Sequence, residues 1–191
     1  ILGQSVKSAL KGNSIAYVPQ AEEVDWSFPV LVRDVVMMGR YGYMGFLRNP
    51  APTDHQAVTT ALERVNMIEF RKHQIGELSG GQRKRVFLAR ALAQNGQIIL
   101  LDEPFNAIDR KTLIDLTELI NQWHSGQRTI IMVTHDLDYV QAHCPKTLLL
   151  ARECIGYGST KNILTVDNLK RARQLSESFD EHAPWCQQGA A

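Results

Sequence analysis

The fold is decided by two stretches that lie close together in the chain, LSGGQRKR at residues 78–85 and IILLDEP at residues 98–104. The Ala- and Leu-rich segment between them predicts one helix from residue 82 to about residue 93. Ser79 is a favourable N-cap for this helix, and the two glycines after it allow a ligand to approach the backbone closely. Because a helix start carries unpaired N–H groups and a positive dipole end, the first stretch predicts a site for an anion such as phosphate.

The second stretch predicts a buried strand that ends in two acidic residues. Residues 97–101 are mainly apolar and match a strand that is buried on both faces, and Asp102 and Glu103 follow directly. Asp102 can face a Mg²⁺ ion while Glu103 faces an attacking water, which is half of a phosphoryl-transfer site. Solvated acids at a strand end would explain the pair alone, but not the pair together with the first stretch in this order and spacing.

In these stretches the chain resembles the ATP-binding cassette (ABC) ATPases. Residues 78–82 match the family signature LSGGQ, and residues 98–103 match the Walker B strand with its catalytic Glu. Three further blocks resemble the Q-loop, the D-loop and the switch-histidine loop, and they are YVPQ at 17–20, NAID at 106–109 and VTHD at 133–136. The resemblance covers about residues 15 to 140. It implies an α/β fold, with the parallel-sheet core of a P-loop (RecA-like) NTPase and an inserted α-helical subdomain.

The resemblance also implies a role for individual residues, with ATP and Mg²⁺ as cofactors. Glu103 would be the general base for water, and His135 would bond the γ-phosphate or that water. Asp102 would position Mg²⁺, and Gln20 would reach the metal or the water. Asp109 would communicate across a dimer of ATP-binding subunits. The signature residues of each subunit would contact the ATP held by the other subunit, and in this chain they are Ser79, Gly80, Gly81 and Gln82.

The family's phosphate-cradling loop, G-x-x-x-x-G-K-[ST], is absent, because none of the 13 glycines is followed by Lys. We expect an N-terminally truncated chain that lacks the first strands and the Walker A motif; a degenerate paralogue is the alternative. Three lost charge-assisted hydrogen bonds correspond to roughly 5–9 kcal/mol. A micromolar affinity amounts to about 8 kcal/mol in total, so this chain alone should bind ATP poorly.

Four parts are expected along the chain. They are a remnant of the nucleotide-binding core up to the Q-loop (residues 1–20), the helical subdomain (21–78), the signature helix and the core with Walker B, D-loop and switch His (79–164), and a C-terminal helix and tail (165–191). Periodicity predicts further elements. They are helices at 34–38, 54–66, 110–124 and 168–179, a short element at 68–73, a buried strand at 129–134, and strands at 147–150 and 154–157.

Composition excludes several classes of protein. The contents of 44% hydrophobic and 21% charged residues are ordinary for a globular protein, and a net charge of +1 gives no reason to expect a nucleic-acid partner. Three cysteines without metal-ligand spacing favour a reduced, cytosolic setting. No apolar run approaches the roughly 20 residues that span a bilayer, and no leader is recognisable. A membrane role would therefore depend on a partner subunit.

The block at residues 24–42 resembles ATPase subunits of manganese/iron-type metal importers and implies contact with a permease, although simple packing would also explain its aromatic and Met residues. The resulting hypothesis is an ATP-hydrolysing subunit that powers import of manganese or iron, or of zinc, at the cytoplasmic face of the cell membrane. Its partners would be a second ATP-binding subunit, the permease and, indirectly, an extracytoplasmic metal-binding protein. The alternatives are a non-transport ABC ATPase and a binding-only remnant that offers its signature helix in trans. A neighbouring gene for a multi-span permease would argue against the non-transport alternative.

Overall fold

The computed structural model describes residues 1–20, 29–106 and 108–177. The chain forms two compact units, Ile1–Val133 and Thr134–Ala191, and each is described by itself. The predicted α/β fold is confirmed, because the first unit contains a parallel sheet with helices packed against it. Part of the block at 24–42, the D-loop residue Ala107 and the tail from residue 178 lie outside the described residues.

The first unit is built on a three-stranded parallel sheet. Its strands are β1 (Ile15–Val18), β2 (Ile98–Asp102) and β3 (Thr129–Val133), in the spatial order β1-β2-β3. Val18 lies opposite Leu101, and Asp102 lies opposite Val133. Because the strands are parallel and in this register, the chain leaves β1 and β2 at the same edge of the sheet.

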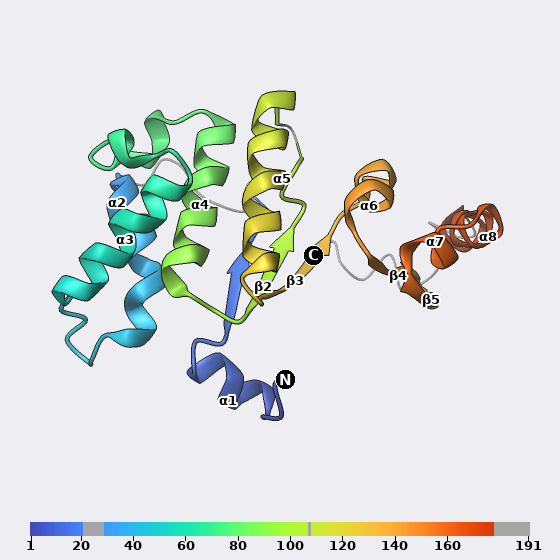
Figure 1. The fold of residues 1–191 in the computed structure, drawn as a ribbon, viewed down its shortest axis with the longest axis horizontal. Coiled ribbons are helices and arrows are strands. Elements are labelled where there is room, and N and C mark those ends of the chain that lie inside the picture. The colour runs from blue at the N-terminus through green and yellow to red at the C-terminus, as the bar shows by residue number, and fades with distance from the viewer. Residues whose placement is uncertain (21–28, 107, 178–191) are drawn as a thin grey trace, which may run out of the picture. The chain divides into compact units, whose positions relative to one another are not determined.

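Helices α4 (Gly80–Gln94) and α5 (Arg110–Ser125) cover one face of this sheet (Figure 1). Val86 and Leu88 of α4 and Leu116 of α5 are almost completely buried. They belong to one hydrophobic core with Ile99 and Leu101 of β2. The helix predicted from residue 82 is thus confirmed and begins two residues earlier, because Ser79 caps it at Gly80.

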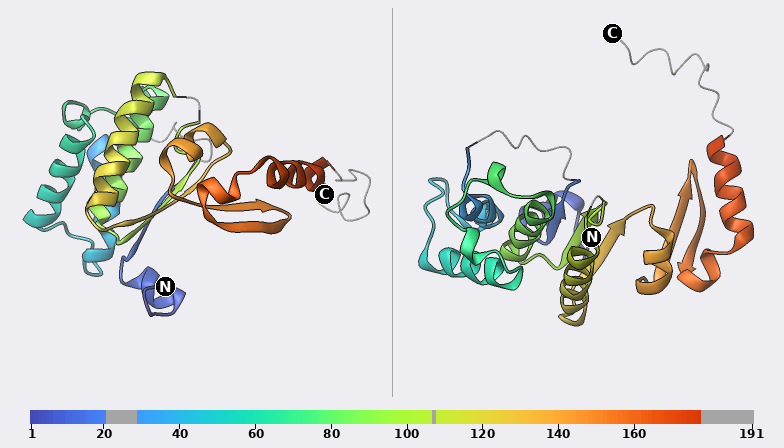
Figure 2. Two further views of the ribbon diagram at one scale, coloured as in Figure 1. Left: turned by 45° about the vertical axis from the view of Figure 1, so that its right-hand side comes forward. Right: turned by 90° about the horizontal axis from the view of Figure 1, so that it is seen from above.

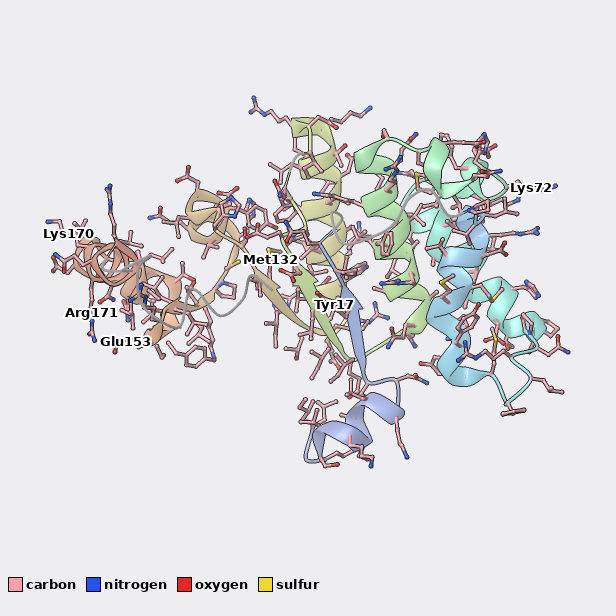
Figure 3. The ribbon with its side chains drawn as sticks, turned by 180° about the vertical axis from the view of Figure 1, so that it is seen from behind. Tyr17, Lys72, Met132, Glu153, Lys170 and Arg171 are labelled. Atoms are coloured by element: carbon pink, nitrogen blue, oxygen red, sulfur yellow. The ribbon has the colours of Figure 1, made fainter. Side chains whose placement is uncertain are left out.

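The other face of the sheet is largely open, which corrects the prediction of a buried strand at 129–134. Ile131 is 50% exposed and Val133 is 61% exposed. Tyr17, labelled in Figure 3, is 46% exposed on the same face of β1. Within the first unit no layer of helices covers these side chains, so they are exposed although they are apolar. Ile114 of α5, an apolar residue of the helix predicted at 110–124, is likewise exposed.

Three helices pack against the side of α4, and they are α2 (Val32–Met37), η2 (Met38–Tyr43) and α3 (Pro52–Arg64). The short helix η3 (Ile68–Phe70) contacts α3, and η4 (Ile75–Glu77) precedes the signature stretch. The Arg40 guanidinium holds three elements together. It donates to Asp54 Oδ1 on α3 at 2.9 Å and to the Ala93 carbonyl of α4 at 2.9 Å. The Ala51 N–H and the Arg40 guanidinium keep the pKa of Asp54 below its ordinary value of 3.8.

A short helix, α1 (Val6–Lys11), precedes β1 and was not predicted. Ser5 caps it by accepting the Ser8 N–H at 3.2 Å. The chain then turns at Asn13, whose φ is +55°. Such a left-handed conformation suits Asn better than most residues, so the turn into β1 is locally encoded.

The second unit contains an antiparallel hairpin of β4 (Lys146–Ala151) and β5 (Glu153–Ser159), clear in the left view of Figure 2. Helices α6 (Leu137–His143), α7 (Thr160–Ile163) and α8 (Val166–Glu177) complete it. An ion pair between Arg171 and Glu153 ties α8 to the hairpin (Figure 3). Throughout the described part of the chain, no helix is long and apolar enough to cross a bilayer.

Candidate functional site

A small pocket lies where the chain leaves β1 and β2. Eight residues line it, and they are Val18, Pro19, Lys84, Phe87, Leu88, Asp102, Glu103 and Pro104. The register of the strands brings the residues after Val18 beside those after Leu101. The pocket therefore joins the start of the predicted Q-loop to the two predicted Walker B carboxylates, with α4 as its third wall.

Asp102 is half-buried at the end of β2, and its carboxylate has a partner on the neighbouring strand. The Tyr17 hydroxyl donates a hydrogen bond to Asp102 Oδ2 at 3.1 Å. A carboxylate oxygen suits Mg²⁺, which usually takes one or two protein carboxylates and completes its shell with water and substrate phosphates. No cluster of three or more His, Cys, Asp or Glu suited to a metal occurs within the described residues. The Asp102 carboxylate is thus a donor that fits a Mg²⁺ ion which also carries phosphate and water ligands.

Glu103 has an unusual backbone conformation, with a φ of +42°. A non-glycine residue in this region costs about 1–3 kcal/mol and persists only when its surroundings fix it. Two bonds do so here. The Glu103 N–H donates to the Val133 carbonyl at 3.0 Å, and the Glu103 carbonyl accepts the Asn106 N–H at 3.2 Å. The turn at residues 103–106 thus fixes the direction in which the Glu103 side chain leaves the backbone.

The signature stretch forms the start of α4, as the sequence predicted. Ser79 is the N-cap, and its hydroxyl accepts the Gln82 N–H at 3.3 Å. Gln82 returns the contact, because its Oε1 accepts the Ser79 N–H at 2.9 Å. This reciprocal pair is a capping box. Gly80 is exposed, and a Cβ built on it meets no atom within 4 Å. The helix start is therefore ordered by its own side chains, and the space beside Gly80 is open.

The start of α5 packs beside the start of α4. Asp109 caps α5, because its carboxylate accepts the Thr112 N–H at 3.0 Å and the Thr112 hydroxyl at 2.7 Å. These two bonds lower the pKa of Asp109 below its ordinary value of 3.8. A Cβ on Gly81 would lie 3.3 Å from the Thr112 hydroxyl oxygen. The glycine thus lets the signature helix approach the Asp109 cap closely.

The predicted site residues are therefore placed as follows. Asp102 and Glu103 line one pocket with Pro19, and Gln20 comes directly after Pro19 in the chain. Ser79, Gly80, Gly81 and Gln82 form the start of α4, next to the Asp109 cap. His135 is an exposed residue of the second unit, so its role with Glu103 stays a prediction.

Tyr17 and Lys84 were missed as site residues. Lys84 lies three and four residues before Phe87 and Leu88, which is the spacing of one helix face. All three line the pocket. That spacing was a usable signal, since it places the Lys84 cation on a helix face that is otherwise apolar. Tyr17 gave no signal, because its bond to Asp102 joins two residues 85 positions apart.

Comparison with known proteins identifies a family. The family model described as ABC transporter matches residues 1–106. Among solved structures, a metal-chelate type ABC transporter in an inward-facing conformation superposes with a TM-score of 0.78 and is 34% identical, covering 84% of this chain and 64% of that chain. A nucleotide-free ATP-binding cassette from an ABC transporter gives a TM-score of 0.68 at 18% identity, covering 87% and 67%, which supports the fold alone.

Curated relatives include three metal-transport proteins. The manganese transport system ATP-binding protein MntA of Synechocystis sp. is 52% identical, over 88% of this chain and 65% of its own length. The chelated iron transport system membrane protein YfeB of Yersinia pestis is 50% identical, over 86% and 56%. The zinc transport system ATP-binding protein TroB of Treponema pallidum is 40% identical, over 83% and 59%. The chain thus spans less than two thirds of each of these relatives.

Proposed function

Because this chain belongs to the ABC transporter family, we propose that it is part of the ATP-hydrolysing subunit of an importer for a divalent metal ion, manganese, iron or zinc. The observation that carries the proposal is the pocket at the ends of β1 and β2, where Asp102 and Glu103 lie together. The relatives named for manganese, iron and zinc support the class of cargo. The metal ion that is transported would be bound by other subunits.

In the proposed reaction Glu103 is the general base that takes a proton from the attacking water. Glu103 follows Asp102 directly, and its own left-handed backbone conformation is fixed by the turn. We infer that this keeps its carboxylate at the pocket. Asp102, with Gln20, would hold a Mg²⁺ ion, and this ion supplies charge stabilisation at the phosphates when bound. The Tyr17 hydroxyl orients Asp102. We assign to His135 the contact with the γ-phosphate.

The start of α4 would serve the ATP of a second subunit. The open space beside Gly80 and the positive dipole end of the helix suit a phosphate. Asp109 bonds Thr112, which lies against Gly81. Through this contact Asp109 would couple closure at one ATP site of the dimer to the other ATP site. A dimer of ATP-binding subunits is therefore part of the proposal.

The contact with the permease is assigned to an exposed apolar patch after η2. Phe46 is 100% exposed and Leu47 is 87% exposed, and Met38 and Tyr43 of η2 itself are also exposed. Exposed apolar patches on a soluble domain commonly mark an interaction site. Binding there would place the subunit at the cytoplasmic face of the membrane. Replacing Phe46 and Leu47 by Ser should abolish stimulation of ATP hydrolysis by the permease, while Ile114→Ser, also exposed, should not.

The central experiment uses the complete subunit assembled with its permease. Glu103→Gln should lower the rate of ATP hydrolysis at least about a hundredfold, because it removes the general base. ATP binding should persist, since the amide keeps the shape of the side chain. Glu118→Gln, an exposed residue of α5, is the matched control. Unchanged hydrolysis in Glu103→Gln would remove Glu103 from the mechanism.

A further inference from the structure

Three consecutive basic residues in α4 reach three different places. The Arg83 guanidinium donates to the Gly76 carbonyl at 2.9 Å, and Arg85 pairs with Asp115 of α5 at 2.6 Å. Lys84, between them, is half-buried and donates from Nζ to the Asn106 carbonyl. Of the three, Lys84 is the residue that lines the pocket with Asp102 and Glu103.

The bond to Asn106 gives Lys84 a hold on the turn that carries Glu103. Asn106 ends that turn, because its N–H donates to the Glu103 carbonyl at 3.2 Å. Glu103 begins the turn with a φ of +42°, a conformation that needs support from its surroundings. Asn106 therefore links the Lys84 ammonium, which its carbonyl accepts from, to the strained residue Glu103, to which its N–H donates. The cation thus acts on the backbone of the turn and also lines the pocket.

The charge of Lys84 also suits this place. Two carboxylates, Asp102 and Glu103, line the same pocket as the half-buried Lys84 ammonium, and opposite charges in one pocket attract each other. An ammonium with three donors can hold a backbone carbonyl and still face acidic neighbours. A neutral residue of similar length would fill the space without either contribution.

We propose that Lys84 is a positioning residue for Glu103, holding the 103–106 turn through Asn106 and thereby linking the signature helix to the carboxylate within one subunit. The inference rests on the proposed function for the catalytic role of Glu103. The geometric part, in which Lys84 fixes the turn, can be measured without any nucleotide.

The test compares Lys84→Met, Lys84→Arg and the control Lys111→Met, which changes an exposed lysine of α5. Hydrogen exchange is measured in the complete subunit without nucleotide. Lys84→Met should speed exchange of the Asn106 amide about tenfold, because one of the bonds that fix its turn is lost. Lys84→Arg should restore protection, and Lys111→Met should leave it unchanged. Unchanged exchange in Lys84→Met would overturn the proposal.

Kinetics then test the link to Glu103. In the assembled transporter Lys84→Met should lower kcat about ten- to a hundredfold with a KM for ATP changed less than about threefold, since a misplaced base affects the chemical step. Lys84→Arg should recover most of kcat. A raised KM with normal kcat would overturn the positioning role. If Glu103→Gln itself leaves turnover unchanged, the proposed function fails, and the exchange measurement still decides whether Lys84 holds the turn.

Discussion

The two ends of helix α4 are stabilised in different ways. At its C-terminal end the last carbonyls accept hydrogen bonds from outside the helix. Arg40 donates to Ala93 at 2.9 Å, and the Tyr43 hydroxyl donates to Gln94 at 2.7 Å. A cation at this end also complements the helix dipole. The C-terminal end of α4 is therefore anchored to the helices packed on its side.

The N-terminal end of α4 depends on its own residues. Ser79 and Gln82 cap each other, and the space in front of Gly80 is open. In the proposed function, the C-terminal end of α4 therefore serves stability and its N-terminal end serves ligand binding. Substitutions at the anchored end should unfold the protein, whereas substitutions at the open end should leave it folded and alter its function.

The largest effect is expected from Arg40→Ala. The change leaves the Asp54 carboxylate, 6% exposed, without its cation and removes the donor to Ala93. Breaking a buried pair in this way costs about 3–5 kcal/mol. Urea unfolding of the purified chain measures it. Arg33→Ala breaks an exposed pair with Asp34 and should cost less than about 1 kcal/mol. Equal losses in the two variants would contradict the anchoring role of Arg40.

A second comparison uses one glycine that packs against the C-terminal half of α4 and one at the N-terminal end of α4. A Cβ on Gly39 would lie 2.3 Å from the Arg90 carbonyl oxygen of α4, so Gly39→Ala should destabilise the fold by about 1–3 kcal/mol. Gly80→Ala meets open space and replaces glycine in a helix, so its stability should be unchanged or higher by up to about 1 kcal/mol. Thermal unfolding of both variants provides the measurement. A destabilised Gly80→Ala would show that the N-terminal end is more constrained than we infer.

Ser79→Ala should have a smaller effect, about 1 kcal/mol, because it removes the acceptor for the Gln82 N–H. Ser79→Asp should keep the cap and remain within about 0.5 kcal/mol of the wild type. Denaturant unfolding at neutral pH checks both values. If Ser79→Ala costs nothing, the helix start is held by contacts other than its capping box.

The smallest expected effect concerns the stability of the folded state at acidic pH. The pKa of Asp109 is lowered by its bonds to Thr112, so the ionised carboxylate stabilises the folded state. This contribution is present above the ordinary value of 3.8 and is lost as the pH falls through the lower folded value. The difference in unfolding midpoint between wild type and Asp109→Asn should therefore be constant from about pH 7 to pH 5 and decline below about pH 4. A difference that grows on acidification would contradict the assignment.

Local patterns of the sequence predicted much of this structure. Ser79 before two glycines predicted the start of α4, and the apolar run before Asp102 predicted β2, since caps and periodicity are encoded within a few residues. The Arg40–Asp54 pair and the Lys84 bond to Asn106 were not predicted. These contacts depend on which helix faces which neighbour, and a pattern within one element does not contain that information.

The strand at 129–134 shows a different limit. Its continuous run of apolar residues at 130–133 predicted burial, yet Ile131 and Val133 are exposed. A hydrophobic pattern shows that a strand favours burial, but it does not show whether another element packs against that strand. The helix α1 and the short helices α6 and α7 were also missed, because four to seven residues give too little periodicity.

The open face of the sheet has a practical consequence for handling the protein. Half-exposed Ile131 and Val133 lie on β3, and within the described residues no further strand pairs with its outer edge. Surfaces of this kind associate when the solvent drives apolar groups together. Light scattering from a solution of this chain should rise with protein concentration and with added ammonium sulfate. A colloid-stable preparation would need lower ionic strength, or a charged side chain in place of Ile131.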